Sequence, residues 1–164
     1  MSWIELKSDT VTAALQYPDS VSLVFASHKR PGGGYLRHER GQEEWIARRT
    51  DLVERLQPFK HMYGSNVKAF YILLKDIKFM ESKEKRDLIC VPAPLAPSKT
   101  RTPLYKDLDQ ELESRIKHMC ELVKSYKVFI IGPWGCGFFG NKVETVKALF
   151  KKHATNETIV FVTK

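Results

Sequence analysis

Residues 21–45 have the sequence VSLVFASHKRPGGGYLRHERGQEEW, and this stretch decides how the fold is interpreted. The apolar run at 21–26 has the length and composition of a buried β-strand. A loop with three consecutive glycines follows it. A helix then begins near Gln42, because apolar residues recur at helical spacing from that point. A strand, a glycine-rich loop and a helix in this order are typical of a layered α/β fold.

The rest of the chain continues this alternation. Further strands are expected at 69–74, 88–91, 128–131 and 158–162, and further helices at about 107–126 and after Asn141. We expect Pro58 to end the first helix and Asn141 to cap the last one, with Glu144 completing a capping box. This order predicts an α/β layered fold with a largely parallel or mixed sheet.

Composition limits the class of protein. A chain of 164 residues suits one domain, 1–164, and a hydrophobic fraction of 43% is enough for a folded core. The 27 Lys and Arg residues against 19 Asp and Glu residues give a net charge of +8. This charge favours polyanionic partners, such as nucleic acid, poly(ADP-ribose) or a nucleotide, and fits simple solubility equally well.

Cysteine and histidine spacing predicts no metal site. Cys90, Cys120 and Cys136 form no C-x-x-C pair, which favours a reducing compartment, and the five histidines have no zinc-ligand spacing. Residues 1–15 lack the apolar core of a signal peptide, and no stretch has the length of a membrane span. We expect a soluble intracellular protein, cytoplasmic or nuclear.

Two glycine-rich loops each follow an expected strand, at 31–34 and at 132–140. In open α/β sheets, ligands lie at the carboxyl ends of strands. Glycines let backbone N–H groups approach an anion, and the following helix start adds positive partial charge. Glycines also serve tight turns, but two such loops favour a nucleotide-like ligand with a diphosphate. Neither loop is a P-loop, and the G-x-G-x-x-G letters at 135–140 lack the βαβ unit of a dinucleotide site.

Gln42, Glu43 and Glu44 occupy the first turn of the helix after the triple glycine. Acidic residues are common there because the helix dipole stabilises them. Their place at the carboxyl end of a strand also suits chemistry on a ribose glycosidic bond, which breaks through an oxocarbenium-like transition state. One carboxyl group can protonate the leaving oxygen and then activate water.

These residues resemble a known family. Gly32-Gly33-Gly34, seven residues, and then Gln42-Glu43-Glu44 resemble the GGG-x(6–8)-QEE signature of poly(ADP-ribose) glycohydrolases. The segments Phe25-Ala26-Ser27, Pro31, Val91-Pro92-Ala93-Pro94 and 134–141 are similar to elements of the microbial branch, so the resemblance runs from Phe25 to Asn141. It implies a three-layer α/β/α macrodomain with a mixed, largely parallel central sheet.

The resemblance also implies site roles. Glu44 would be the general acid/base, and Glu43 would bind ribose hydroxyls beside the scissile bond. Phe139 would pack on the ADP-ribose, and Asp9 would bond adenine, although an exposed loop aspartate is the commoner explanation. The other implied substrate-binding residues are Gly32, Gly33, Gly34, Gln42, Gly135, Cys136, Gly137, Phe138, Gly140 and Asn141.

The implied substrate is ADP-ribose or poly(ADP-ribose), on its own or attached to protein or nucleic acid. We expect no cofactor, no metal and no membrane partner, and we expect the protein to be a monomer. Two other functions stay open: a non-catalytic ADP-ribose-binding macrodomain and, ranked last, a nucleic-acid-binding protein. Trp45 is expected in the core and Trp134 as a loop anchor. The basic residues that flank the first loop suit a solvated loop or a polyanion equally, and they are Lys29, Arg30, Arg37 and Arg40.

Overall fold

The computed structural model describes residues 1–100 and 102–163, and a six-stranded sheet with the order β1-β6-β5-β2-β4-β3 runs through this part of the chain. All neighbouring strands are parallel except the antiparallel pair β3 and β4. The strands are β1 Ser2–Lys7, β2 Ser20–Phe25, β3 Ile72–Lys78, β4 Lys85–Val91, β5 Val128–Ile131 and β6 Thr158–Thr163. The α-helices are α1 Thr10–Gln16, α2 Gln42–Arg49, α3 Leu52–Leu56, α4 Leu108–Leu122 and α5 Val143–His153.

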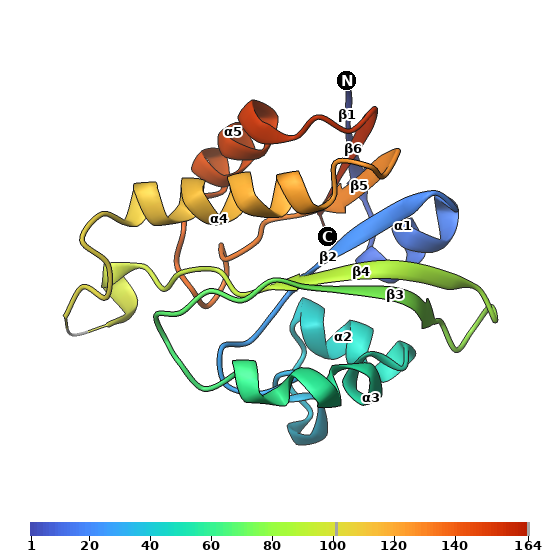
Figure 1. Cartoon of the computed structure of the whole chain (residues 1–164), viewed down its shortest axis with the longest axis horizontal. Helices are drawn as coiled ribbons and strands as arrows, with labels where there is room; N and C mark the ends of the chain where they lie inside the picture. Colours follow the sequence, from blue (N-terminus) through green and yellow to red (C-terminus); the bar gives the residue numbers. More distant parts are fainter. Residues whose placement is uncertain (101, 164) are drawn as a thin grey trace.

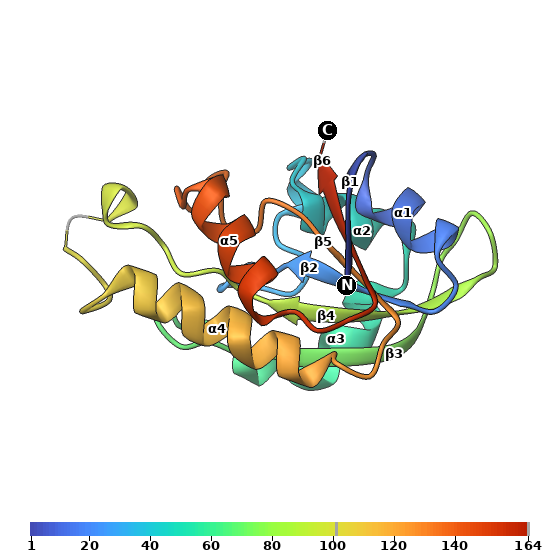
Figure 2. The ribbon, with the colours of Figure 1, turned by 90° about the horizontal axis from the view of Figure 1, so that it is seen from above.

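Helices cover both faces of the sheet (Figures 1 and 2). Helices α4 and α5 lie on one face, and α1, α2 and α3 lie on the other. Strand β2 shows why both faces are apolar: Val21 and Leu23 pack towards α4 and α5, and Val24 packs towards α1 to α3. A strand buried on both faces needs apolar residues at every position rather than alternate ones. The prediction of a three-layer α/β/α fold with a mixed, largely parallel sheet is confirmed.

Strand β1 and helix α1 were not expected from the sequence. In β1, Ser2, Ile4, Glu5 and Lys7 are exposed, because this strand lies at the edge of the sheet and pairs only with β6. An exposed edge strand has no buried apolar run to reveal it. Helix α1 has seven residues, too few for a clear helical period.

The expected first helix is interrupted. Helix α2 ends at Arg49, and Thr50 adopts an extended conformation with φ −142° and bridges Phe79. The Thr50 hydroxyl donates to the Ile46 carbonyl at 2.9 Å and accepts from the Leu52 N–H at 3.2 Å, so it ends one helix and begins the next. The α-helical segment ends at Leu56, just before Pro58, as expected. The chain continues as the 3₁₀ helix η2, Gln57–Met62, and Pro58 lies in its first turn, where the missing N–H is not needed.

The predicted capping box of the last helix is also wrong. The residue at the cap position of α5 is Lys142, and it makes no side-chain capping bond. The Asn141 side chain instead donates to the carbonyls of Pro94, at 2.8 Å, and Gly135, at 2.9 Å. Asn141 therefore joins the loop after β4 to the second glycine-rich loop rather than beginning the helix.

Candidate active site

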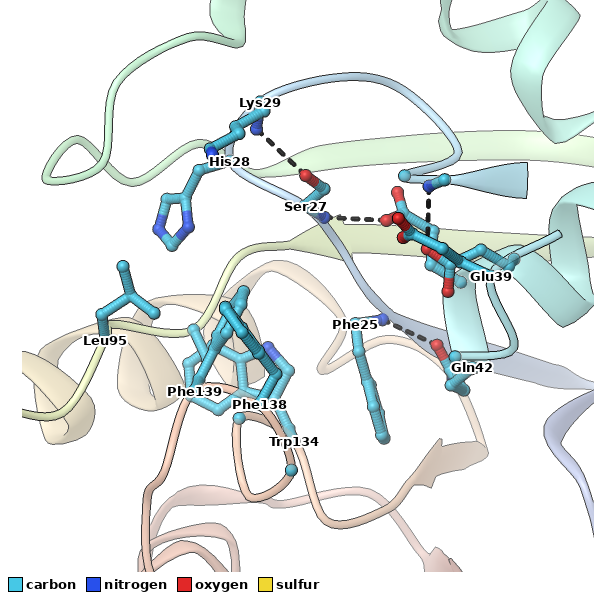
Figure 3. A pocket seen from close by; sticks show the side chains of 18 of the residues that line it. Phe25, Ser27, His28, Lys29, Glu39, Gln42, Leu95, Trp134, Phe138 and Phe139 are labelled. Carbon is cyan, nitrogen blue, oxygen red and sulfur yellow. Dashed lines mark hydrogen bonds between the residues drawn. The ribbon is translucent and has the colours of Figure 1, made fainter. Parts of the chain in front are cut away.

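A pocket of about 610 Å³ lies between the two glycine-rich loops, beyond the carboxyl end of β2 (Figure 3). One wall is formed by residues between Phe25 and Glu44, and the facing wall by residues between Pro133 and Phe139. A second pocket of about 250 Å³ adjoins it, because both are lined by Phe25, Gln42 and Pro133. Both glycine-rich loops therefore face one cavity, and it lies at the carboxyl ends of the strands, as expected.

The first loop folds around the two carboxylates. Gly32 and Gly33 have positive φ angles of 78° and 59°, a region that favours glycine. This turn directs the Gly32 N–H to Oε2 of Glu43 at 3.2 Å and the Gly34 N–H to Oε2 of Glu44 at 3.0 Å. The sequence predicted that the triple glycine contacts the ligand. Two of its N–H groups bind the protein's own carboxylates, and Gly33 and Gly34 line the pocket.

Glu43 has both oxygens occupied. Oε1 accepts from the Ser27 N–H at 2.9 Å, Oε2 accepts from Gly32, and only 3% of the residue is exposed. Burial raises the pKa of Glu43 to about 8, and the charge of Glu44 adds to the rise against the hydrogen bonds from Ser27 and Gly32. Glu43 is thus a carboxyl group fixed in the wall, and it resists losing its proton.

Glu44 is the carboxylate with an oxygen to spare. Its Oε2 accepts from Gly34, whereas its Oε1 accepts no hydrogen bond from the residues that the structure describes. A Cβ atom on Gly41 would lie 2.3 Å from that Oε1, so the absence of a side chain there makes room for the carboxylate. The geometry distinguishes the two glutamates: Glu43 is held by the loop, and Glu44 offers an oxygen to a ligand.

Gln42 uses its side chain inside the protein. Its Oε1 accepts from the Phe25 N–H at 2.8 Å, and its Nε2 donates to the Leu23 carbonyl at 2.8 Å and to the Thr10 hydroxyl at 3.0 Å. These bonds fix the start of α2 against the end of β2 and the start of α1. The sequence predicted Gln42 as substrate-binding, and the structure places it in the pocket lining with its amide atoms engaged.

Trp134 anchors the second glycine-rich loop to the end of strand β4. Trp134 is fully buried and its Nε1 donates to the Val91 carbonyl at 2.8 Å, so the expectation of a loop anchor is confirmed. Gly135 has a φ of 73°, and a Cβ atom there would lie 2.5 Å from Ala93. Of the predicted residues of this loop, Gly135, Gly137, Phe138 and Phe139 line the pocket. Cys136, Gly140 and Asn141 do not line the pocket. The Asn141 side chain supports the loop through its hydrogen bond to the Gly135 carbonyl.

Asp9 caps α1 and lies at the second pocket. Its carboxylate accepts from the Thr12 N–H at 2.9 Å and the Thr12 hydroxyl at 2.8 Å. Trp45, expected in the core, is a partly buried side chain that packs against the core. It also lines the second pocket with Asp9 and Arg40. The structure therefore places Asp9 beside the main pocket rather than in it.

Sequence reasoning missed two residues near the pocket. His28 lines it with 4% of the residue exposed, and burial, helped by the charge of Arg115, lowers the pKa of His28 to about 4. Arg115 is 1% exposed and donates to the carbonyls of Pro92 and Val67 and to the Tyr105 hydroxyl, at 2.8, 3.0 and 3.1 Å. A charged residue within the apolar stripe of α4 was a signal for Arg115, whereas nothing in the sequence pattern distinguished His28.

Among the described residues, no group of His, Cys, Asp and Glu is arranged to hold a metal ion. None of the helices in that part of the chain is long and apolar enough to cross a membrane.

Comparisons with known proteins agree with this geometry. Residues 5–76 match the family model described as the catalytic domain of microbial-type PARG, that is, poly(ADP-ribose) glycohydrolase. The poly(ADP-ribose) glycohydrolase of Thermomonospora curvata superimposes with a TM-score of 0.86 and 20% identity over 99% of this chain and 70% of that chain. The fold is that of the bacterial poly(ADP-ribose) glycohydrolases.

Two further structures of such enzymes contain ligands. A point mutant of the Deinococcus radiodurans poly(ADP-ribose) glycohydrolase in complex with ADP-ribose has a TM-score of 0.86 and 22% identity, over 100% of this chain and 78% of that one. The Thermomonospora curvata enzyme bound to the inhibitor ADP-HPD has a TM-score of 0.82 and 21% identity, over 99% and 72%. A comparison with curated protein sequences finds no match. The resemblance to microbial poly(ADP-ribose) glycohydrolases seen in the motifs is confirmed by the family model and the fold.

Proposed function

We propose that this chain binds ADP-ribose in the main pocket and hydrolyses ADP-ribosyl glycosidic bonds, with Glu44 as general acid and base. One observation carries the proposal: of two adjacent carboxylates held by the triple-glycine loop, only Glu44 keeps an oxygen that the described chain does not bind. The match to the microbial poly(ADP-ribose) glycohydrolase model covers both glutamates and supports the same reaction.

The pocket dimensions suit this ligand. A cavity of about 610 Å³ with an adjoining one of about 250 Å³ falls in the range that small-molecule and cofactor sites occupy. We place the adenine in the second pocket beside Asp9 and Trp45, the diphosphate along the second glycine-rich loop, and the terminal ribose between Glu44 and Phe139. This arrangement uses the strand ends and the loops as α/β sheets commonly do.

The chemistry needs one proton donor. Protonated Glu44 gives its proton to the leaving oxygen as the bond from that oxygen to the anomeric carbon breaks, which leaves an oxocarbenium-like ribose. The Glu44 carboxylate then takes a proton from water as the water oxygen bonds to the anomeric carbon. The products are ADP-ribose and a free hydroxyl on the leaving group, and Glu44 regains its proton.

Glu43 supports this reaction from the wall. Its oxygens already accept hydrogen bonds from Ser27 and Gly32, but each carboxylate oxygen has a second acceptor position that a ribose hydroxyl can use. Burial raises the pKa of Glu43 to about 8, so Glu43 keeps its proton near neutral pH and can also donate to a ribose oxygen.

Glu44→Gln is the decisive variant, because it keeps the shape of the side chain and removes the acid. The parent, Glu44→Gln and the control Glu54→Gln, an exposed residue of α3, would each be incubated with poly(ADP-ribose), and released ADP-ribose would be quantified by chromatography. We expect release by the parent and the control, at least about a hundredfold slower release by Glu44→Gln, and ADP-ribose binding by all three in calorimetry.

Other outcomes separate the alternatives. Turnover by Glu44→Gln at the parent rate would remove Glu44 from the mechanism. A parent that binds ADP-ribose but releases none from the polymer would be a reader, or an enzyme for ADP-ribosylated protein or nucleic acid, which would be assayed next.

We extend the proposal to a single macrodomain over residues 1–164 that acts as a monomer in the cytoplasm or nucleus.

A further inference from the structure

One buried side chain in the main pocket lacks a hydrogen-bond partner. His28 lies three residues beyond the end of β2, lines the pocket, and has a buried Nε2 that bonds to no described residue. Its ring packs against Phe139 with 5.4 Å between the ring centres. Buried polar atoms nearly always have partners, and an apolar side chain would fill the same space without the penalty. An unsatisfied nitrogen in a ligand pocket therefore points to a partner that the ligand supplies.

The position of His28 suggests which part of the ligand that is. Figure 3 shows His28, Leu95 and Phe139 on the side of the pocket away from Glu39 and Gln42. Gln42 borders both pockets, so the side near Gln42 is the one that continues into the second pocket. A ligand with its base in the second pocket and its ribose at Glu44 has its leaving group on the opposite side, which is the side of His28.

The chemical character of this side limits the leaving group. Burial and the charge of Arg115 keep the His28 ring neutral near neutral pH, because its pKa is lowered to about 4. A neutral imidazole has one donor and one acceptor nitrogen, and a hydroxyl group can pair with either. A half-turn about the Cβ–Cγ bond exchanges the two ring edges without moving the ring plane, so a ligand can select the edge it meets. The exposed Lys29 and Arg30 also line this pocket, but the atoms nearest His28 include the Phe139 ring, and a neutral imidazole packed on that ring suits a sugar hydroxyl better than a charged side chain.

We propose that His28 is a specificity residue that hydrogen-bonds a hydroxyl of the leaving group, and that it makes the site prefer ribose leaving groups, as in a poly(ADP-ribose) chain. This inference rests on the proposed function for the orientation of the ligand. It predicts that His28 contributes to binding of the polymer and contributes nothing to binding of free ADP-ribose, which has no leaving group.

The test compares two ligands on variants that do not turn over. In the Glu44→Gln background, His28→Leu, His28→Ala and His28→Gln would be titrated in calorimetry with free ADP-ribose and with short poly(ADP-ribose) oligomers. We expect His28→Leu and His28→Ala to weaken oligomer binding about fivefold to tenfold and ADP-ribose binding less than about twofold. His28→Gln keeps a polar group at a similar distance and should recover most of the loss. His61→Leu, which removes an exposed histidine outside the pocket lining, should change neither affinity.

The possible outcomes are distinct. If both His28→Leu and His28→Ala weaken the two ligands equally, or neither ligand at all, the inference is overturned. His28→Ala decides the matter should the leucine variant fail to fold. Release of ADP-ribose by the parent is measured separately: a parent that releases none while His28→Ala loses only oligomer affinity refutes the glycohydrolase and keeps the His28 contact. A parent that binds neither ligand refutes both.

Discussion

Gly33 lies so close to Glu44 that a Cβ atom on Gly33 would stand 2.2 Å from Oε2 of the glutamate. The same atom would stand 2.8 Å from Oε1 of Glu43. The glycine loop and the carboxylate pair therefore depend on one another. The loop can bind both carboxylates with its N–H groups only because its central residue has no side chain.

Gly33→Ala should disturb both glutamates at once. The φ of 59° strains any residue other than glycine by about 1–2 kcal/mol, and the added methyl group also displaces the carboxylates. We expect ADP-ribose affinity in calorimetry to fall at least about tenfold. Gly64→Ala is the matched control, because Gly64 also has a positive φ, of 116°, but nothing lies within 4 Å of its missing Cβ. An equal loss of affinity by both variants, relative to the parent, would show that strain rather than crowding is the cause.

Glu43→Gln should change how stability depends on pH. The folded-state pKa of Glu43 is raised to about 8 from an ordinary value of 4.5, so between these values the folded protein holds a proton that the unfolded chain has lost. Its contribution to stability is fully present below pH 4.5 and is lost as the pH rises through 8. Between pH 4.5 and 8, the free energy of unfolding of the parent should therefore fall, relative to that of the variant, by up to about 1.4 kcal/mol per pH unit. Urea unfolding at pH 5, 6, 7 and 8 measures the difference, and parallel profiles would contradict it.

Asn141→Ala should loosen the second loop. The variant loses the hydrogen bonds to Pro94 and Gly135, which should lower the free energy of unfolding by about 1–3 kcal/mol and reduce ADP-ribose affinity severalfold. Asn156→Ala is a close control, because the buried Asn156 also donates to two carbonyls, those of Val123 and Tyr126, but does not line the pocket. It should lose similar stability and keep its affinity. A loss of affinity by both variants would mean that stability alone governs binding.

Arg115→Met should destabilise the whole fold. The substitution keeps the apolar packing but leaves the Pro92 and Val67 carbonyls without their donor, so we expect the free energy of unfolding to fall by about 2–4 kcal/mol. Lys117→Met, at an exposed position of the same helix, should change it by less than about 0.5 kcal/mol. Chemical denaturation measures both. A loss below about 1 kcal/mol for Arg115→Met would show that water replaces the guanidinium group.

The sequence predicted the parts of the fold that are buried on both sides. Strand β5 lies at the predicted residues because all four of its side chains are buried, and such a run is apolar throughout. Strand β1 was not predicted, because it lies at the edge of the sheet, most of its side chains are exposed, and its sequence has no continuous apolar run. The break at Thr50 depends on a bridge to Phe79, a distant residue that local periodicity does not report.

The site was predicted at the level of loops, and less well at the level of atoms. The motif grouped Gly33, Glu43 and Glu44 in one site, and in the structure all three line the same pocket. That Asn141 supports a loop rather than a helix follows from the position of Pro94, which no local pattern gives. His28 could not be recognised, because its significance lies in a missing partner, and partners are set by tertiary contacts.

The Gln42 side chain has a mechanical consequence. By accepting from the Phe25 N–H and donating to the Leu23 carbonyl, it makes the pair of bonds that a residue of a parallel neighbouring strand would make. It does so beyond Ser22, where the pairing of β2 with β5 has ended, and thus serves as one more rung of the ladder. The wall that bears the carboxylates is therefore preorganised as part of the sheet. We therefore expect any adjustment to a ligand to occur in the opposite wall, where Phe138 is 80% exposed.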